Sequence, residues 1–138
     1  MTRTDLQQLA TIRIAEAQAL LSAGFAAGAY YLAGYAVECA IKSCIAKNVQ
    51  QHDFPDKDRV NQSYSHNLVQ LIRAANLEDE FNNAKVKNQA FDDFWKVVKD
   101  WTESARYDAT ITNVNAANLI AAIIDPAHGV LPWLVQRW

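Results

Sequence analysis

A stripe of large apolar side chains in the second half of the chain constrains the fold most strongly. Its members follow a 3–4 spacing with charged residues between them: Phe91, Phe94, Trp95, Val98, Trp101 and Ala105. This spacing gathers them on one face of an α-helix that is predicted to end near Arg106. No stretch of the chain shows the apolar–polar alternation of a half-buried strand. The pattern therefore predicts a protein built from helices packed on one another.

Two long helices are expected in the N-terminal part of the chain. The first is predicted to begin at Thr4, where residues 4–7 have the form of a capping box. It is predicted to end near Gly24, because glycine is favoured just after a helix C-terminus. The second is predicted to run from about Phe25 to Val49, and the small alanines along one of its sides would let another helix approach closely.

Shorter helices are expected in the rest of the chain. One begins near Ser65, one begins at Thr112 or Asn113, and a short one lies at the C-terminal end. With the helix of the apolar stripe, and without the short C-terminal helix, they bring the number of main helices to five. The length of 138 residues and the 51% of hydrophobic residues are those of one folded domain. We therefore expect residues 1–138 to form a single all-α domain, an antiparallel bundle of four to five helices.

Two connecting segments are expected to lie outside these helices. Residues 50–63 are polar and contain Pro55, so they predict a loop. Residues 78–87 are dense in charge and predict a mobile stretch that Phe81 anchors to the core.

Three features bear on the compartment of the protein. The uncharged run from Ala19 to Val37 is long enough to cross a membrane, but it is dominated by alanine, glycine and tyrosine and is interrupted at Gly24. A buried helix explains it better. Cys39 and Cys44 would point about 140° apart on a helix, which predicts two reduced, buried thiols. The N-terminus has no signal-peptide pattern, so we expect a cytoplasmic protein with no membrane association.

The sequence carries no specific signature of a metal or cofactor site. His52, His66 and His128 are scattered, and no HExxH or paired CxxC motif occurs. The glycines do not follow a strand in the spacing of a phosphate-binding loop. No metal and no cofactor are therefore expected. The net charge of −2 at pH 7 also argues against a broad basic surface for nucleic acid.

One polar stripe on the second predicted helix is a candidate ligand-binding surface. Tyr31, Tyr35, Glu38 and Lys42 are spaced 4, 3 and 4 residues apart, so they lie on one helix face. The simpler interpretation is an intrahelical Glu–Lys ion pair flanked by half-buried tyrosines. The functional interpretation is a polar patch that faces other binding residues across a groove.

Arg106 and Tyr107 are the candidates for the other side of that groove. An arginine can bind phosphate or carboxylate with two parallel hydrogen bonds, and a tyrosine can stack on a base. The functional interpretation predicts that Arg106 lies near Glu38 or Lys42, in a pocket or at a dimer cleft. The simpler interpretation is that Arg106 caps free carbonyls at the end of a helix. His66 follows Ser65, where a surface or capping histidine is the default.

Four stretches of the chain resemble the HEPN family, small helical domains named for nucleotide binding in higher eukaryotes and prokaryotes. Residues 35–42 (YAVECAIK) are similar to the family's AvE-x-x-x-K, and residues 65–71 (SHNLVQL) to its H-x-L-x-x-L. Residues 101–107 (WTESARY) are similar to its W-x-x-x-x-RY, and residues 129–134 (GVLPWL) to tails seen in this group. These short stretches are spread over most of the chain, from residue 35 to residue 134.

The resemblance implies an antiparallel bundle of four or five helices that often forms homodimers. Members are frequently encoded beside a minimal nucleotidyltransferase in bacterial toxin–antitoxin pairs. Many are metal-independent ribonucleases that use an arginine and, after four to six intervening residues, a histidine. Here the corresponding positions after Arg106, residues 111–113, are Ile-Thr-Asn, and no histidine occurs before His128. A general acid or base that titrates near neutral pH is thus absent from its expected place.

Three hypotheses about function follow. The first is a HEPN-type homodimer without the Arg-His centre, which binds a nucleotide, RNA or a nucleotidyltransferase partner. The second is a divergent, metal-independent ribonuclease, the toxin of a toxin–antitoxin pair, that uses Arg106 with His66 or Tyr107. The third is a structural dimer with no small-molecule site.

Overall fold

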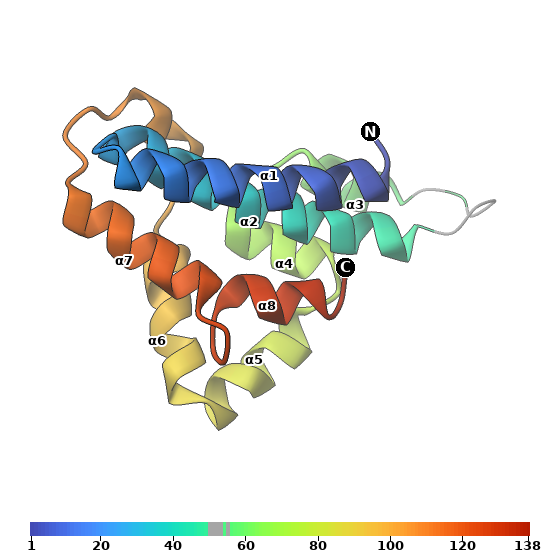
Figure 1. The fold of residues 1–138 in the computed structure, drawn as a ribbon. Coiled ribbons are helices and arrows are strands. Elements are labelled where there is room, and N and C mark those ends of the chain that lie inside the picture. Colours follow the sequence, from blue (N-terminus) through green and yellow to red (C-terminus); the bar gives the residue numbers. More distant parts are fainter. Residues whose placement is uncertain (50–53, 55) are drawn as a thin grey trace.

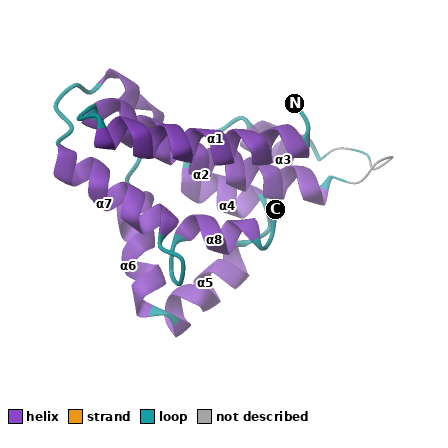
Figure 2. Cartoon of the chain, in the orientation of Figure 1, coloured by secondary structure: helices purple, strands orange, loops and turns teal. Residues whose placement is uncertain are grey.

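The computed structural model describes residues 1–49, 54 and 56–138. Within these ranges the chain forms eight α-helices, one 3-10 helix and no strand (Figure 2). In chain order they are α1 (Arg3–Ser22), α2 (Ala26–Asn48), α3 (Lys57–Ser63), α4 (Leu68–Ala74), α5 (Glu78–Lys87), α6 (Gln89–Val98), the 3-10 helix η1 (Glu103–Tyr107), α7 (Asn113–Ile124) and α8 (Val130–Val135). The all-α class predicted from the sequence is confirmed.

The second helix, α2, is the centre of the protein. It lies alongside α1 over most of its length and also packs against α4, η1, α7 and α8 (Figure 1). Its file of small residues, Ala29, Ala33, Ala36 and Ala40, is completely buried, as a close approach of neighbouring helices requires. On the other side of the bundle, α5 and α6 pack against each other, and α7 packs between α6 and the α1–α2 pair. A functional group placed on α2 is therefore held by most of the fold.

The first helix begins earlier than the sequence pattern predicted. Its N-cap is Thr2, whose hydroxyl accepts from the Asp5 amide at 3.1 Å, while the Thr2 amide donates to the Asp5 carboxylate at 2.8 Å. The prediction of a capping box at residues 4–7 is wrong, because an aspartate three residues after Thr2 completes the reciprocal pair first. The end near Gly24 is confirmed, since this residue adopts a left-handed φ of 87°.

Part of the predicted loop at 50–63 is helical. Residues 57–63 form α3, whose N-terminus is capped by the Asp56 carboxylate accepting from the Asp58 amide at 3.0 Å. The remaining positions of that prediction, 50–53 and 55, lie outside the described residues. The next helix begins at Leu68 and not near Ser65, because Asn67 supplies the cap.

The charged stretch at 78–87 forms the helix α5, so the prediction of a mobile segment is wrong. Acidic residues occupy its first turn and lysines its last, which complements the helix dipole. Phe81 is buried as predicted and meets the rings of Phe91, Trp95 and Trp133 edge-on, at centroid distances of 5.1, 4.6 and 5.2 Å. This aromatic cluster fixes α5 and α6 to the C-terminal end of the chain.

The helix of the apolar stripe is shorter than predicted. It ends at Val98, and the chain then turns so that Trp101 enters the core at 1% exposure. The indole occupies the space beside Gly34 on α2, where an added Cβ would lie 2.2 Å from the ring. The predicted burial of Trp95 and Trp101 is confirmed. This turn releases residues 103–107 from α6 to form η1 against α2.

The remaining predictions concern α7, the membrane and the cysteines. Thr112 caps α7, which begins at Asn113 as expected. No helix within the described residues is both long and apolar enough to span a membrane, because the turn at Gly24 divides the uncharged run. Cys39 and Cys44 are both buried and free, and burial raises the pKa of the Cys44 thiol to about 11.

Candidate functional site

A buried carboxylate lies in the middle of α2. Glu38 is only 2% exposed, and a charge in such a position is costly unless it is paired and hydrogen-bonded. Two cationic or polar groups meet its Oε1 atom: Lys42 Nζ at 2.9 Å, one turn further along α2, and His66 Nδ1 at 2.9 Å. The intrahelical Glu–Lys pair expected from the spacing is therefore present, and it has a third member from a distant part of the chain.

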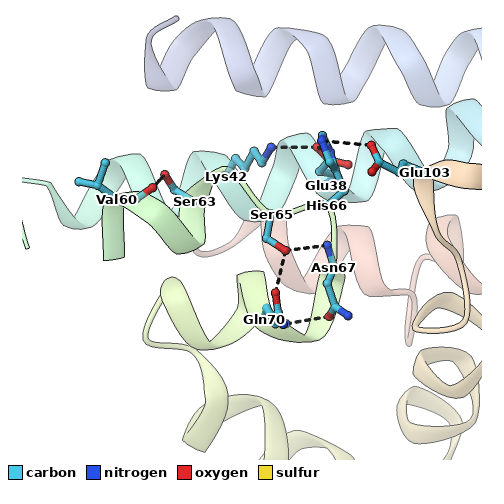
Figure 3. Close-up of polar contacts among 9 residues, drawn as sticks. All are labelled: Glu38, Lys42, Val60, Ser63, Ser65, His66, Asn67, Gln70 and Glu103. Atoms are coloured by element: carbon cyan, nitrogen blue, oxygen red, sulfur yellow. Dashed lines mark hydrogen bonds and ion pairs between the residues drawn. The ribbon is translucent and has the colours of Figure 1, made fainter. Parts of the chain in front are cut away.

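His66 connects three segments of the structure. It lies between α3 and α4, and its second ring nitrogen, Nε2, is 3.1 Å from Glu103 Oε2 on η1 (Figure 3). The imidazole thus bridges a buried carboxylate on α2 and a half-exposed one on η1. His66 is itself 45% exposed, so one side of the ring faces solvent. We call Glu38, Lys42, His66 and Glu103 the carboxylate–imidazole cluster.

Local hydrogen bonds fix the backbone that carries His66. The Ser65 hydroxyl accepts from the Asn67 amide at 3.0 Å and donates to the Gln70 side chain at 2.8 Å. The Asn67 side chain accepts from the Gln70 amide at 3.1 Å (Figure 3). The cap is thus made by Asn67, which leaves the His66 ring free to turn toward α2. Of the two default roles, the capping one is wrong for His66, whereas its 45% exposure agrees with a surface histidine.

The two tyrosines of the predicted stripe form an aromatic stack with Trp101. The centre of the Tyr31 ring lies 6.2 Å from that of Tyr35 and 6.2 Å from that of Trp101, and the angles between the ring planes are 15° and 26°. Both tyrosines are half-buried. Burial, together with the neighbouring Cys39 thiol, raises the pKa of Tyr35. The stack borders the cluster along α2, because Glu38 follows Tyr35 by one helical turn.

Arg106 and Tyr107 lie on the outer side of η1. Both are exposed, and the guanidinium carbon of Arg106 is 4.9 Å from the centre of the Tyr107 ring. Among the residues that the structure describes, Arg106 forms no ion pair or hydrogen bond with Glu38 or Lys42, and none with a helix carbonyl. The predicted pairing of Arg106 with α2 is not observed as a direct contact. The η1 side chain that reaches toward α2 is Glu103, two residues after Trp101, through its contact with His66.

A polar hollow of about 560 Å³ opens beside η1. Its lining mixes an aromatic ring with hydroxyl, amide and charged groups, and includes Tyr30, Thr102, Ser104, Asp108 and Asn115. Burial, together with the carboxylates of Asp100 and Asp108, raises the pKa of the Tyr30 phenol. Sequence reasoning missed the hollow, because its residues come from α2, α6, η1 and α7 and share no spacing.

Sequence reasoning also missed Glu103. It sits inside the W-x-x-x-x-RY stretch, but nothing in that pattern distinguishes it from a solvated glutamate. Only the turn after Val98 brings it to His66. Within the described ranges, no three His, Cys, Asp or Glu side chains gather in a way that could hold a metal ion. His52 lies outside those ranges.

Comparison of the chain with protein-family models, curated proteins and solved structures finds no match. The fold and the site themselves define an all-α protein in which the carboxylate–imidazole cluster, with the buried Glu38 at its centre, joins a short 3-10 helix to α2. This helix carries an exposed arginine–tyrosine pair, and its Ser104 and Ala105 line a hollow.

Proposed function

We propose that the protein is a homodimeric, cytoplasmic module of the HEPN type that binds a nucleotide or RNA through Arg106 and Tyr107 and does not cleave it. The observation that carries the proposal is the exposure of both residues on η1, with the guanidinium carbon of Arg106 over the Tyr107 ring, 4.9 Å from its centre. A guanidinium supplies charge-assisted hydrogen bonds to phosphate. An exposed tyrosine ring supplies a stacking surface for a base.

The hollow beside η1 gives such a ligand somewhere to lie. Its hydroxyl and amide groups, such as those of Thr102, Ser104 and Asn118, are hydrogen-bonding partners for a base or a ribose. Asp100 and Asp108 of the lining would repel phosphate, and Lys96 is the one cation among the described residues of the lining. Arg106 and Tyr107 are not among these lining residues, so in this proposal the base or sugar lies in the hollow and the phosphate lies outside it, toward the exposed Arg106.

Residues 111–113 lack the imidazole that RNA cleavage would need, so we expect binding without cleavage. A histidine at one of these positions would be the proton-transfer group of the family's ribonucleases. Here the Thr112 hydroxyl caps α7, and Asn113 is the first residue of that helix. Neither side chain exchanges a proton near neutral pH as an imidazole does.

A homodimer would double the single arginine–tyrosine pair. This matters because the net charge is −2, so the affinity for an anionic ligand has to come from a local site. The same surface is also suited to a protein partner, for which a minimal nucleotidyltransferase is the first candidate. Sedimentation of the purified chain tests the dimer, and co-purification with neighbouring gene products tests the partner.

Binding of fluorescent single-stranded RNA and of nucleotides tests the proposed function. We expect the wild type to bind and the variants Arg106→Ala and Tyr107→Ala to bind at least about tenfold more weakly. Arg73→Ala and Tyr64→Ala are matched controls, because Arg73 has a 61% exposed side chain away from η1 and Tyr64 is 75% exposed. Equal binding by all five proteins, or no binding at all, would reject the proposal.

A second candidate function is a metal-independent ribonuclease, and the position of His66 favours it. Its Nδ1 atom is oriented by a buried carboxylate, which is how many catalytic histidines are held. Such an enzyme would cut RNA in the presence of a metal chelator, and both His66→Ala and Arg106→Ala would lose the activity. Cutting by either variant at the wild-type rate would exclude this mechanism.

A further inference from the structure

The contacts of His66 with two carboxylates depend on whether its imidazole ring is protonated. A neutral imidazole has one N–H donor and one acceptor nitrogen, whereas an imidazolium has two donors. Both ring nitrogens of His66 face carboxylate oxygens, Glu38 at 2.9 Å and Glu103 at 3.1 Å. Ionised carboxylates only accept hydrogen bonds. Both contacts are therefore hydrogen bonds only when the ring carries its second proton.

We propose that His66 is a protonation-dependent latch, a positioning residue that holds η1 and its Arg106–Tyr107 pair against α2. With the proton, His66 donates to both carboxylates and ties η1 to the core. Without it, one nitrogen presents a lone pair to a carboxylate and that contact is lost. The Glu103 contact is the one that opens, because Glu103 has 47% of its side chain exposed and can turn to water, while Glu38 is buried.

The charges around His66 are consistent with this latch. On α2 they are Glu38 and Lys42, whose ion pair leaves no net charge, and on η1 the facing group is Glu103. The protonated ring balances Glu103, since two cations then meet two anions. Tyr35 and Cys39 of α2 adjoin Glu38 as neutral groups whose pKa values are raised by burial. On α1, the positive charge of Arg13 acts to lower the pKa of the Cys39 thiol, against the effect of burial. Arg13 itself already forms an ion pair with Glu16 at 2.7 Å.

The latch acts on a segment that has few other polar ties. The η1 amides of Ala105 and Asp108 bond locally, to Thr102 and to Ala105 at 3.1 Å each. Trp101 and Ala105 hold the base of η1 in the core, so opening the latch loosens the outer part of η1 and leaves the fold intact. Protonation of His66 would also preorganise Arg106 and Tyr107 for binding a nucleotide or RNA, and this step rests on the proposed function.

Glu103→Gln separates the latch from a simple loss of contact. An amide can donate to the lone pair of neutral His66 and can accept from protonated His66. In this variant the hydrogen bond between residue 103 and His66 forms whether or not the ring is protonated. The pH dependence of amide protection at η1 should therefore disappear. His66→Ala should lack the bridge at any pH. His128→Ala is the matched control, because His128 is an exposed histidine hydrogen-bonded to Asn88, far from η1 in sequence.

The experiment measures the hydrogen-exchange protection factor of the Asp108 amide, which follows η1, in full-length protein between about pH 5 and pH 8. For the wild type and His128→Ala we expect protection to fall about tenfold as the pH rises, the loss of one charged hydrogen bond. Glu103→Gln should stay flat and protected, and His66→Ala flat and unprotected. A flat wild type, or a Glu103→Gln variant that still falls tenfold, overturns the latch.

These measurements need no ligand, so their outcome is separable from that of the proposed function. RNA binding measured over the same pH range supplies the link. If the protection factors respond and RNA does not bind, the latch stands and the proposed function fails. If RNA binds with Arg106 dependence while protection is flat, the proposed function stands and the latch fails.

Discussion

The Trp101 indole lies against the backbone of α2 at Gly34, in the space that any side chain at this position would need. This contact turns the chain after α6 and sets where η1 meets α2. A residue without a Cβ on α2 and a tryptophan 67 positions later in the sequence thus together decide where Glu103, Arg106 and Tyr107 are presented.

Gly34→Ala should destabilise the protein despite the higher helix propensity of alanine. The new Cβ would lie 2.2 Å from the Trp101 ring, and overpacking of this kind costs about 1–3 kcal/mol. Gly28→Ala is the control, because there the nearest atom is a flexible Leu20 methyl at 3.3 Å. Urea denaturation should show a loss for the first variant and an unchanged or higher stability for the second. Equal stabilities would contradict the described packing.

Glu38→Ala should be among the most destabilising changes in the chain. It removes the contacts of Glu38 with Lys42 and His66 and leaves a space in the core, and a hydrogen bond to a charged group contributes about 1.5–3 kcal/mol. Lys42 and His66 keep 22% and 45% of their side chains exposed and can turn to water, so we expect a loss of about that size. Glu16→Ala removes a partner from the more exposed Arg13–Glu16 pair and should change the free energy of unfolding by less than about 1 kcal/mol. Similar losses in the two variants would show that Glu38 is not the structural centre of the cluster.

Trp95→Ala should cost about 3 kcal/mol or more, because it removes a buried ring from the aromatic cluster around Phe81. Val86→Ala is the control on α5, since Val86 is 88% exposed. Thermal denaturation followed by circular dichroism compares the two variants. A wild-type melting temperature for Trp95→Ala would mean that α5 and α6 are not held by this cluster.

Cys44 should make the protein less stable in alkali. Burial raises the pKa of its thiol from the ordinary 9.0 to about 11, so the folded state keeps a proton that the unfolded state has lost. Between these values the unfolded chain binds fewer protons than the folded one, and the free energy of unfolding therefore falls as the pH rises. Cys44→Ala should remove part of this slope, measured by urea denaturation at several pH values. An identical slope in both proteins would contradict the assignment.

The sequence predicted the parts of this structure that depend on local patterns. Helical spacing identified the all-α class, the buried Trp95 and Trp101, and the Glu38–Lys42 pair on one face of α2. It misjudged α5, because charges that complement a helix dipole also look like a solvated loop. It also extended α6 past Val98, since Trp101 keeps the helical spacing of the stripe but is buried through a turn.

The candidate site depended on tertiary placement and was predicted only in part. The sequence predicts a surface or capping role for His66; the cap is made by Asn67, and His66 is partly exposed. The partnership of His66 with Glu38 and Glu103 joins residues 28 and 37 positions apart in sequence, and no spacing rule connects them. The predicted approach of Arg106 to Glu38 or Lys42 is not observed as a direct contact, because η1 turns Arg106 and Tyr107 toward solvent.

The salt dependence of RNA binding tests the central claim most directly, because it counts the phosphates neutralised by the protein. Removing one phosphate contact to a single strand should lower the slope of log K against log salt by about 0.7. We therefore predict that Arg106→Ala lowers this slope by about that amount per site, while Arg73→Ala leaves it at the wild-type value. The same slope in wild type and Arg106→Ala would contradict the assignment of Arg106 as the phosphate-binding residue.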